Sequence, residues 1–137
     1  MKQELKDEFQ NVFFQIEHLS DKNIIQTTWI ADGITVNQIQ DGAMIMLEQL
    51  KKNNTSLILN DNRKITGAWD DANEWIANEW MPKAIEIGVR KFAHIISDDL
   101  FDQLSAEFME DNSKKLEGDF QMRLFSNKEK AEAWLAE

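Results

Sequence analysis

The chain of 137 residues has no cysteine and only one proline, Pro82. Without cysteine it can form no disulfide framework, no reactive thiolate and no zinc–thiolate site. This composition fits a reducing compartment, and we expect the protein to be cytoplasmic. No stretch approaches the roughly 20 apolar residues that a membrane span requires. The charged N-terminal sequence MKQELKDEFQ also lacks the apolar segment of a secretion signal.

Basic residues are scarce as well. The 15 lysines and arginines stand against 25 acidic residues, which gives a formal net charge of −10. A charge of this sign opposes binding to nucleic acid and to anionic membrane surfaces. Hydrophobic residues make up 42% of the chain, and the length is typical of one domain. We therefore expect a single globular domain over residues 1–137.

Sequence motifs for catalysis are missing. The chain has no G-x-S-x-G, no glycine-rich phosphate loop and no H-E-x-x-H. His18 and His94 fall on separate predicted strands, and His94 has the apolar neighbours of a core histidine. Asp98, Asp99 and Asp102 stand at the start of a predicted helix, where capping accounts for them better than metal binding. We expect no metal, no cofactor and no enzymatic activity.

The spacing of apolar residues alternates between strand-like and helix-like along the chain. Residues 9–18 and 24–30 are predicted to form an antiparallel hairpin. Further strands are predicted at 56–60, 92–97 and 120–125. These patterns predict an α/β fold in the order β-β-α-β-α-β-α-β-α, with a five-stranded, mixed, mostly parallel sheet and about four helices.

The helices are predicted from their caps and their apolar residues. Thr35 and Gln38 have the spacing of a capping box before the first helix, and Ser126 and Glu129 have it before the last. Ser97 or Asp98 is expected to cap the third helix, whose apolar residues are Leu100, Phe101, Leu104 and Phe108.

The second helix is expected in the segment GAWDDANEWIANEWMP, residues 67–82. At about 100° per residue, Trp69 and Trp80 point within about 20° of each other, which predicts that both pack in the core. Trp75 points about 120° away from them. It is either partly buried against a kink at Pro82 or exposed as an anchor for a partner.

The segment NDNRKITG, residues 60–67, is predicted to be a loop between a buried strand and the second helix. One interpretation is a polar turn in which Thr66 caps the helix. The other is a small anion-binding or phosphorylatable site, where a strand end meets a helix N-terminus. This second interpretation predicts a binding surface made of Asp61, Asn62, Arg63, Lys64 and Trp75, with Thr66 as phospho-acceptor.

Three segments carry a resemblance to a known family: LILNDNRKITGAWDDANEW, FAHIISDDLFDQLSAEFMEDN and MRLFSNKEKAEAWL. They resemble small bacterial STAS-like (SpoIIAA-like) domains, the fold group of the anti-sigma-factor antagonists. The resemblance extends from about residue 8 to the C-terminus. It implies a non-enzymatic regulatory or binding role. In the antagonists a partner kinase phosphorylates a serine ahead of the second helix, and the nearest match here is Thr66.

Three hypotheses about function follow. The first is a STAS-like module that binds a protein partner and forms a homodimer, with Phe9, Phe13 and Trp29 covering the open sheet face or a dimer contact. The second is a carrier for a small molecule or lipid, held near the strand ends. The third, an enzyme with dispersed acid–base residues, has no motif to support it. The many tryptophans, methionines and phenylalanines suit the first two, because they supply adaptable apolar surface.

Overall fold

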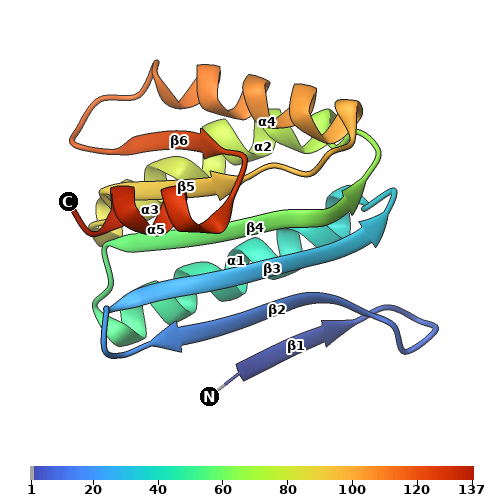
Figure 1. The fold of residues 1–137 in the computed structure, drawn as a ribbon, viewed down its shortest axis with the longest axis horizontal. Coiled ribbons are helices and arrows are strands. Elements are labelled where there is room, and N and C mark those ends of the chain that lie inside the picture. The colour runs from blue at the N-terminus through green and yellow to red at the C-terminus, as the bar shows by residue number, and fades with distance from the viewer. Residues whose placement is uncertain (1) are drawn as a thin grey trace.

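The computed structural model describes residues 2–137, which fold around one six-stranded sheet (Figure 1). The strands lie side by side in the order of the sequence. Strands β1 to β3 pair antiparallel, and β3 to β6 pair parallel. The strands are β1 (Lys2–Lys6), β2 (Val12–Leu19), β3 (Ile24–Asp32), β4 (Leu57–Thr66), β5 (Lys91–Ile95) and β6 (Gln121–Phe125). The α/β class and the antiparallel pairing of the two strands of the predicted hairpin, now β2 and β3, are confirmed.

The predicted strand count of five was one too low, because β1 was not recognised. Its sequence KQELK has no alternation of apolar and polar residues, and only Leu5 is partly buried. The strand forms the sheet edge beside β2. Charged side chains on an edge strand discourage pairing with other chains, so a charged sequence is compatible with this position.

Four helical segments connect or follow the parallel strands. They are α1 (Val36–Asn53), an irregular helix from Asp70 to Ile87, α4 (Leu100–Ser113) and α5 (Lys128–Leu135). The first three pack on one face of the sheet and contribute to the main core, whereas α5 lies on the opposite face over β4 and β5 (Figure 1). The sheet therefore has one fully covered face and one partly covered face.

Helix α1 packs as its sequence predicts. The capping box of Thr35 and Gln38 is present. The buried residues Ile39, Ala43, Met46, Leu47 and Leu50 recur at helical spacing. Gly42 lies against the Trp29 indole of β3, and a Cβ atom at this position would overlap that ring. The glycine thus allows α1 to approach the sheet closely.

The irregular helix contains four short segments in succession. A 3-10 turn, η1 (Asp70–Ala72), leads into α2 (Asn73–Trp75), the π-helical η2 (Ile76–Trp80) and α3 (Met81–Ile87). The irregularity ends at the start of α3, where Pro82 lacks a backbone donor. Trp69 and Trp80 are buried, which confirms the predicted core packing. Trp75 is half-buried against the main core.

The second face of the sheet is covered by α5 over β4, β5 and β6, with Ile24 of β3 at the border of this smaller cluster. Ala131, Trp134 and Leu135 of α5 pack there on Leu59, Ala93 and Ile95. The N-cap of α5 is Asn127, which accepts a hydrogen bond from the Lys130 amide at 2.9 Å, so the predicted capping box at Ser126 and Glu129 was wrong by one residue.

The remaining part of this face needs no apolar cover. Because Phe14 and Ile16 of β2 enter the main core, alternation along the strand places Gln15 and Glu17 on the open side. The residues proposed as cover are located elsewhere: Phe13 and Trp29 are buried in the main core, and Phe9 is exposed in the turn before β2. Phe13 and Trp29 are thus unavailable for a dimer contact.

Candidate functional site

The segment predicted as a loop, residues 60–67, is mostly strand. β4 continues to Thr66, and its pairing with β3 extends to the pair Asp32 and Thr66. The predicted loop was wrong because the parallel ladder with β3 takes up this backbone, and Ile65 is buried in the main core. Thr66 caps no helix: its hydroxyl donates to Asp32 Oδ1 at 2.7 Å, and the irregular helix begins after Trp69.

Alternation along β4 separates the residues of the predicted binding surface. Arg63 donates from Nε and Nη2 to the carboxylate of Asp61, at 3.0 and 2.7 Å. Partial burial opposes ionisation of Asp61, but the hydrogen bonds and charge of Arg63 outweigh it and hold the pKa of Asp61 below its usual value. Charged residues at the start of α5 also favour the ionised forms: they lower the pKa of Asp61 and raise the pKa of Arg63. Asn62 is buried on the other side and donates to Asp102 of α4 at 3.0 Å.

The predicted surface is therefore not assembled as one site. The guanidinium of Arg63 is already paired within the chain, and Asn62 is inaccessible to a partner. Lys64 is exposed on β4, whereas Trp75 is half-buried on the irregular helix.

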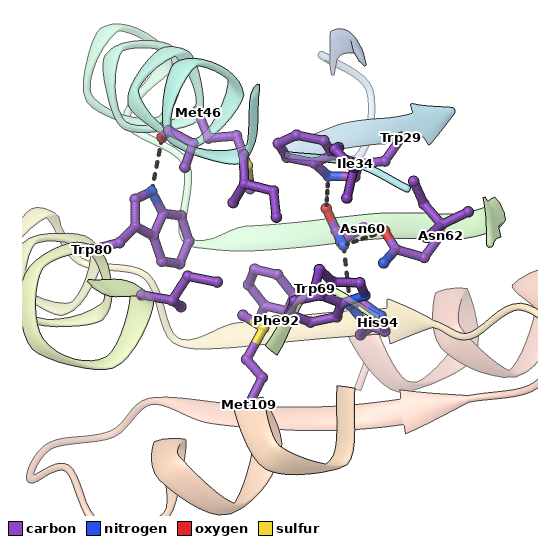
Figure 2. Close-up of a pocket in the computed structure, with 14 residues that line it drawn as sticks. Trp29, Ile34, Met46, Asn60, Asn62, Trp69, Trp80, Phe92, His94 and Met109 are labelled. Atoms are coloured by element: carbon purple, nitrogen blue, oxygen red, sulfur yellow. Dashed lines mark hydrogen bonds between the residues drawn. The ribbon is translucent and has the colours of Figure 1, made fainter. Parts of the chain in front are cut away.

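A buried polar network lies beneath the helices, and Asn60 is its first hub (Figure 2). Asn60 Oδ1 accepts from Thr27 Oγ1 at 2.5 Å and from Trp29 Nε1 at 2.8 Å. Its amide nitrogen must then be the donor to His94 Nδ1, at 3.0 Å. The neutral His94 ring consequently carries its proton on Nε2, which has no hydrogen-bond partner. Burial lowers the pKa of His94 to about 4, so the ring is neutral at physiological pH.

The second hub of the network is Asp102, which is completely buried on α4. Its Oδ1 accepts from Asn62 Nδ2 at 3.0 Å and from Trp69 Nε1 at 2.8 Å. Its Oδ2 accepts from the amide and the hydroxyl of Ser97, at 3.0 and 3.1 Å. Four donors thus compensate a carboxylate that would otherwise be costly to bury.

The other aspartates near the start of α4 have distinct positions. Asp99 is the N-cap and accepts from the Asp102 amide at 3.0 Å, so the predicted cap at Ser97 or Asp98 was wrong by a residue or two. The same Oδ1 of Asp99 accepts from the Gly67 amide at 3.2 Å, which links α4 to the end of β4. Asp98 is exposed.

A pocket of about 60 Å³ lies between the sheet and the helices, lined mainly by apolar side chains (Figure 2). Three indoles line it, and each N–H is already bonded: Trp29 to Asn60, Trp69 to Asp102 and Trp80 to the Ala43 carbonyl. The indoles therefore offer ring faces and carbon rather than free donors, whereas His94, which also lines the pocket, keeps an Nε2–H without a partner. A cavity of about 150 Å³ holds benzene. The present pocket is too small for an aromatic ring or a lipid chain without rearrangement.

The most unusual surface of the molecule is on α4. Four large apolar side chains, Leu100, Phe101, Leu104 and Phe108, are 62%, 59%, 43% and 57% exposed. At about 100° per residue they fall within an arc of about 100°, and together we name them the outer face of α4. The opposite side of the helix is buried although it is largely polar: Asp102, Ser105, Ala106, Met109 and Ser113.

Hydrogen bonds explain this inverted orientation. Besides Asp102, Ser105 is bonded on the inner side, where its hydroxyl accepts from the Trp69 amide at 2.9 Å. The Ser105 carbonyl accepts from Asn73 Nδ2 at 3.0 Å. The sequence pattern identified the helix and its apolar residues. It gave no indication that partners on β4, at Trp69, at Ser97 and on the irregular helix would hold the polar side inward.

No family model, curated protein or solved structure matched the chain in the comparisons made with it. Within residues 2–137, no helix combines the length and apolar character needed to span a membrane.

Proposed function

We propose that the chain is a non-enzymatic, STAS-like protein-binding module that docks a partner on the outer face of α4. The observation that supports this proposal is the exposure of two phenylalanines and two leucines on a single helix face. Contiguous apolar patches on soluble proteins mark interaction sites, and aromatic residues are enriched in interfaces. A helix that buries its polar side and exposes its apolar side provides such a patch.

The resemblance to STAS-like domains is compatible with this proposal. From β2 to α5 the chain follows the order β-β-α-β-α-β-α-β-α, with the irregular helix counted once. A regulatory role through Thr66 is less favoured by the local geometry. The Thr66 hydroxyl is bonded to the Asp32 carboxylate, and a phosphate there would be repelled by the same carboxylate. The proposed interaction therefore depends on α4 and not on phosphorylation.

The carrier hypothesis receives less support from the geometry, because the pocket of about 60 Å³ would have to enlarge to admit a lipid chain. A catalytic role is likewise not favoured. The hubs Asn60 and Asp102 are bonded within the chain and buried, so neither presents a free group to a substrate.

A photo-crosslinking amino acid at position 104, introduced in cells, tests the proposal. The matched control is the same amino acid at Glu48, an exposed position on α1. We expect a protein crosslinked from position 104 and absent from position 48. The partner must then be purified and its affinity measured directly. Leu104→Asp should weaken binding about thirtyfold, as at an interface hot spot, whereas Glu48→Lys should not. Equal affinity for both variants would contradict the proposal.

A further inference from the structure

The outer face of α4 is bordered by acidic residues. The segment from Asp98 to Ser113 contains six acids and no base. Asp98, Glu107 and Asp111 are exposed, and on the helix Glu107 and Asp111 each point within about 20° of Leu100. The first base after the helix, Lys114, lies 4.0 Å from Glu110, within this acidic border. The apolar stripe therefore has negative charge along its Leu100 side, and Asp98 precedes its N-terminal end.

This charge disfavours a second copy of the chain as the occupant. An isologous, antiparallel pair of α4 helices centred on Leu104 would match the apolar stripes, with Leu100 opposite Phe108 of the partner copy. The same geometry places Asp98 of each copy opposite Glu110 and Asp111 of the other. Like charges across an interface oppose association, and each copy also carries a net charge of −10.

From these features we infer that the occupant is an amphipathic helix of another protein, with lysine or arginine along one side of its apolar stripe. This inference rests on the proposed function. The stripe from Leu100 to Phe108 is about 12 Å long at 1.5 Å per residue, with Asp98 before its N-terminal end and Asp111 about one turn beyond Phe108. A helix surface packs most readily against the ridges and grooves of another helix, and basic residues at this spacing would meet the acidic border.

Two peptides provide a matched test on the intact protein. Both copy residues 97–115, so that in isolation the polar side of α4 faces water and the apolar stripe is free. One keeps the native acids, and the other has lysine in place of Asp98, Glu107 and Asp111. Fluorescence anisotropy of the labelled peptides gives their affinities at roughly 0.05 M and 0.5 M salt, which differ strongly in electrostatic screening. Both peptides carry a helix-constraining staple. Circular dichroism checks that the two are equally helical.

We expect the lysine peptide to bind about tenfold or more tightly than the native one at low salt, and this advantage should shrink at high salt. Leu104→Asp in the protein should abolish binding of the lysine peptide. The protein variant Asp98→Lys/Asp111→Lys should reverse the preference, which a merely structural role of these residues would not do. The variant Glu48→Lys on α1 should bind as the wild type does.

Three results would overturn this inference about the occupant. The docking proposal itself is tested separately, by the crosslinking experiment. Equal affinity for the two peptides would show that charge does not select the partner. Tighter binding of the native peptide would identify a second copy of the chain as the occupant. Failure of the wild-type protein to bind either helical peptide would show that the face does not receive a helix of this kind.

Discussion

Helices α1 and α4 lie against the same face of one sheet, yet they present opposite sides to it. α1 buries Ile39, Met46, Leu47 and Leu50, whereas the fully buried side of α4 includes Asp102 and two serines. The large apolar residues of α4 remain exposed. Orientation on a sheet is thus decided by the whole set of available partners, and satisfied hydrogen bonds can outweigh the apolar character of a helix face.

The difference lies in what each helix meets. α1 faces Trp29 and the apolar side chains of β2 and β3. α4 meets donors that an apolar residue could not satisfy: the Trp69 indole, the Asn62 amide and the Ser97 amide. Leaving such donors unpaired in the interior would be unfavourable. The account predicts that the two helices respond differently to matched substitutions.

The largest effect is expected for Asp102→Ala on the inner side of α4. Removing this carboxylate leaves four buried donors without an acceptor, and we expect a loss of about 3 kcal/mol or more in the free energy of unfolding. Urea denaturation measures this loss. Asp111→Ala, at an exposed position of the same helix, should change stability by less than about 0.5 kcal/mol. Similar small effects for both would show that the network does not orient α4.

The same leucine-to-alanine substitution, made once on each helix, compares α1 and α4 directly. Leu50 of α1 is completely buried, whereas Leu104 of α4 is 43% exposed. Leu50→Ala should cost about 3 kcal/mol because it creates a core cavity, and Leu104→Ala should cost under about 1 kcal/mol. Thermal or urea unfolding of both variants provides the comparison. Equal losses would mean that Leu104 is part of the folded core.

The features that follow local rules could be predicted from the sequence. The capping box at Thr35, the apolar stripe of α1, the antiparallel pairing of β2 with β3 and the burial of Trp69 and Trp80 all appear in the structure. Each depends on neighbours a few residues apart. β1 could not be recognised, because an edge strand needs no apolar side and its charged sequence has no alternation.

The candidate site was harder to predict because it depends on tertiary contacts. Residues 60–67 were interpreted as a loop, yet the polar side chains of Asn60 and Asn62 bond inward to His94 and Asp102. A polar strand interior looks like a loop when its partners are more than 30 residues away. For the same reason, no local pattern showed which side of α4 would face the solvent.

Titration of His94 extends the comparison to the polar interior. Its pKa in the folded state, about 4, lies below the ordinary value of 6.5, so between these values the unfolded chain binds a proton that the folded chain does not. The stabilising contribution is complete above about pH 6.5 and is lost as the pH falls toward 4, by up to about 1.4 kcal/mol per pH unit. Urea unfolding at several pH values measures this slope.

The variant His94→Gln provides the control for this titration. It removes the ionisable ring, and the slope between pH 6.5 and 4 should flatten. The lowered pKa values of Asp61 and Asp99 act in a more acidic range, below their ordinary value. A slope that persists in His94→Gln would assign the proton uptake to another group.

A smaller effect is expected on the opposite side of the sheet, at Arg63 and Lys64 of β4. The Arg63 side chain is half exposed and pairs with Asp61, and exposed ion pairs contribute little to stability. The double variant Arg63→Ala/Lys64→Ala should remain folded and lose less than about 1 kcal/mol. It should also bind the lysine peptide as the wild type does, because neither residue belongs to α4. Weaker binding by this variant would show that the interaction involves the surface predicted from the sequence, which includes Arg63 and Lys64.

The most direct test of the account is the free energy of unfolding of Phe101→Asp/Phe108→Asp, measured by urea denaturation at micromolar concentration. Both side chains are more than half exposed. If the outer face of α4 is free for a partner, it contributes little to the stability of the folded chain. The free energy of unfolding of the double variant should then differ from that of the wild type by less than about 1 kcal/mol. A loss of about 3 kcal/mol or more, comparable to removing a core side chain, would contradict the central claim and place these phenylalanines in the core of the folded protein.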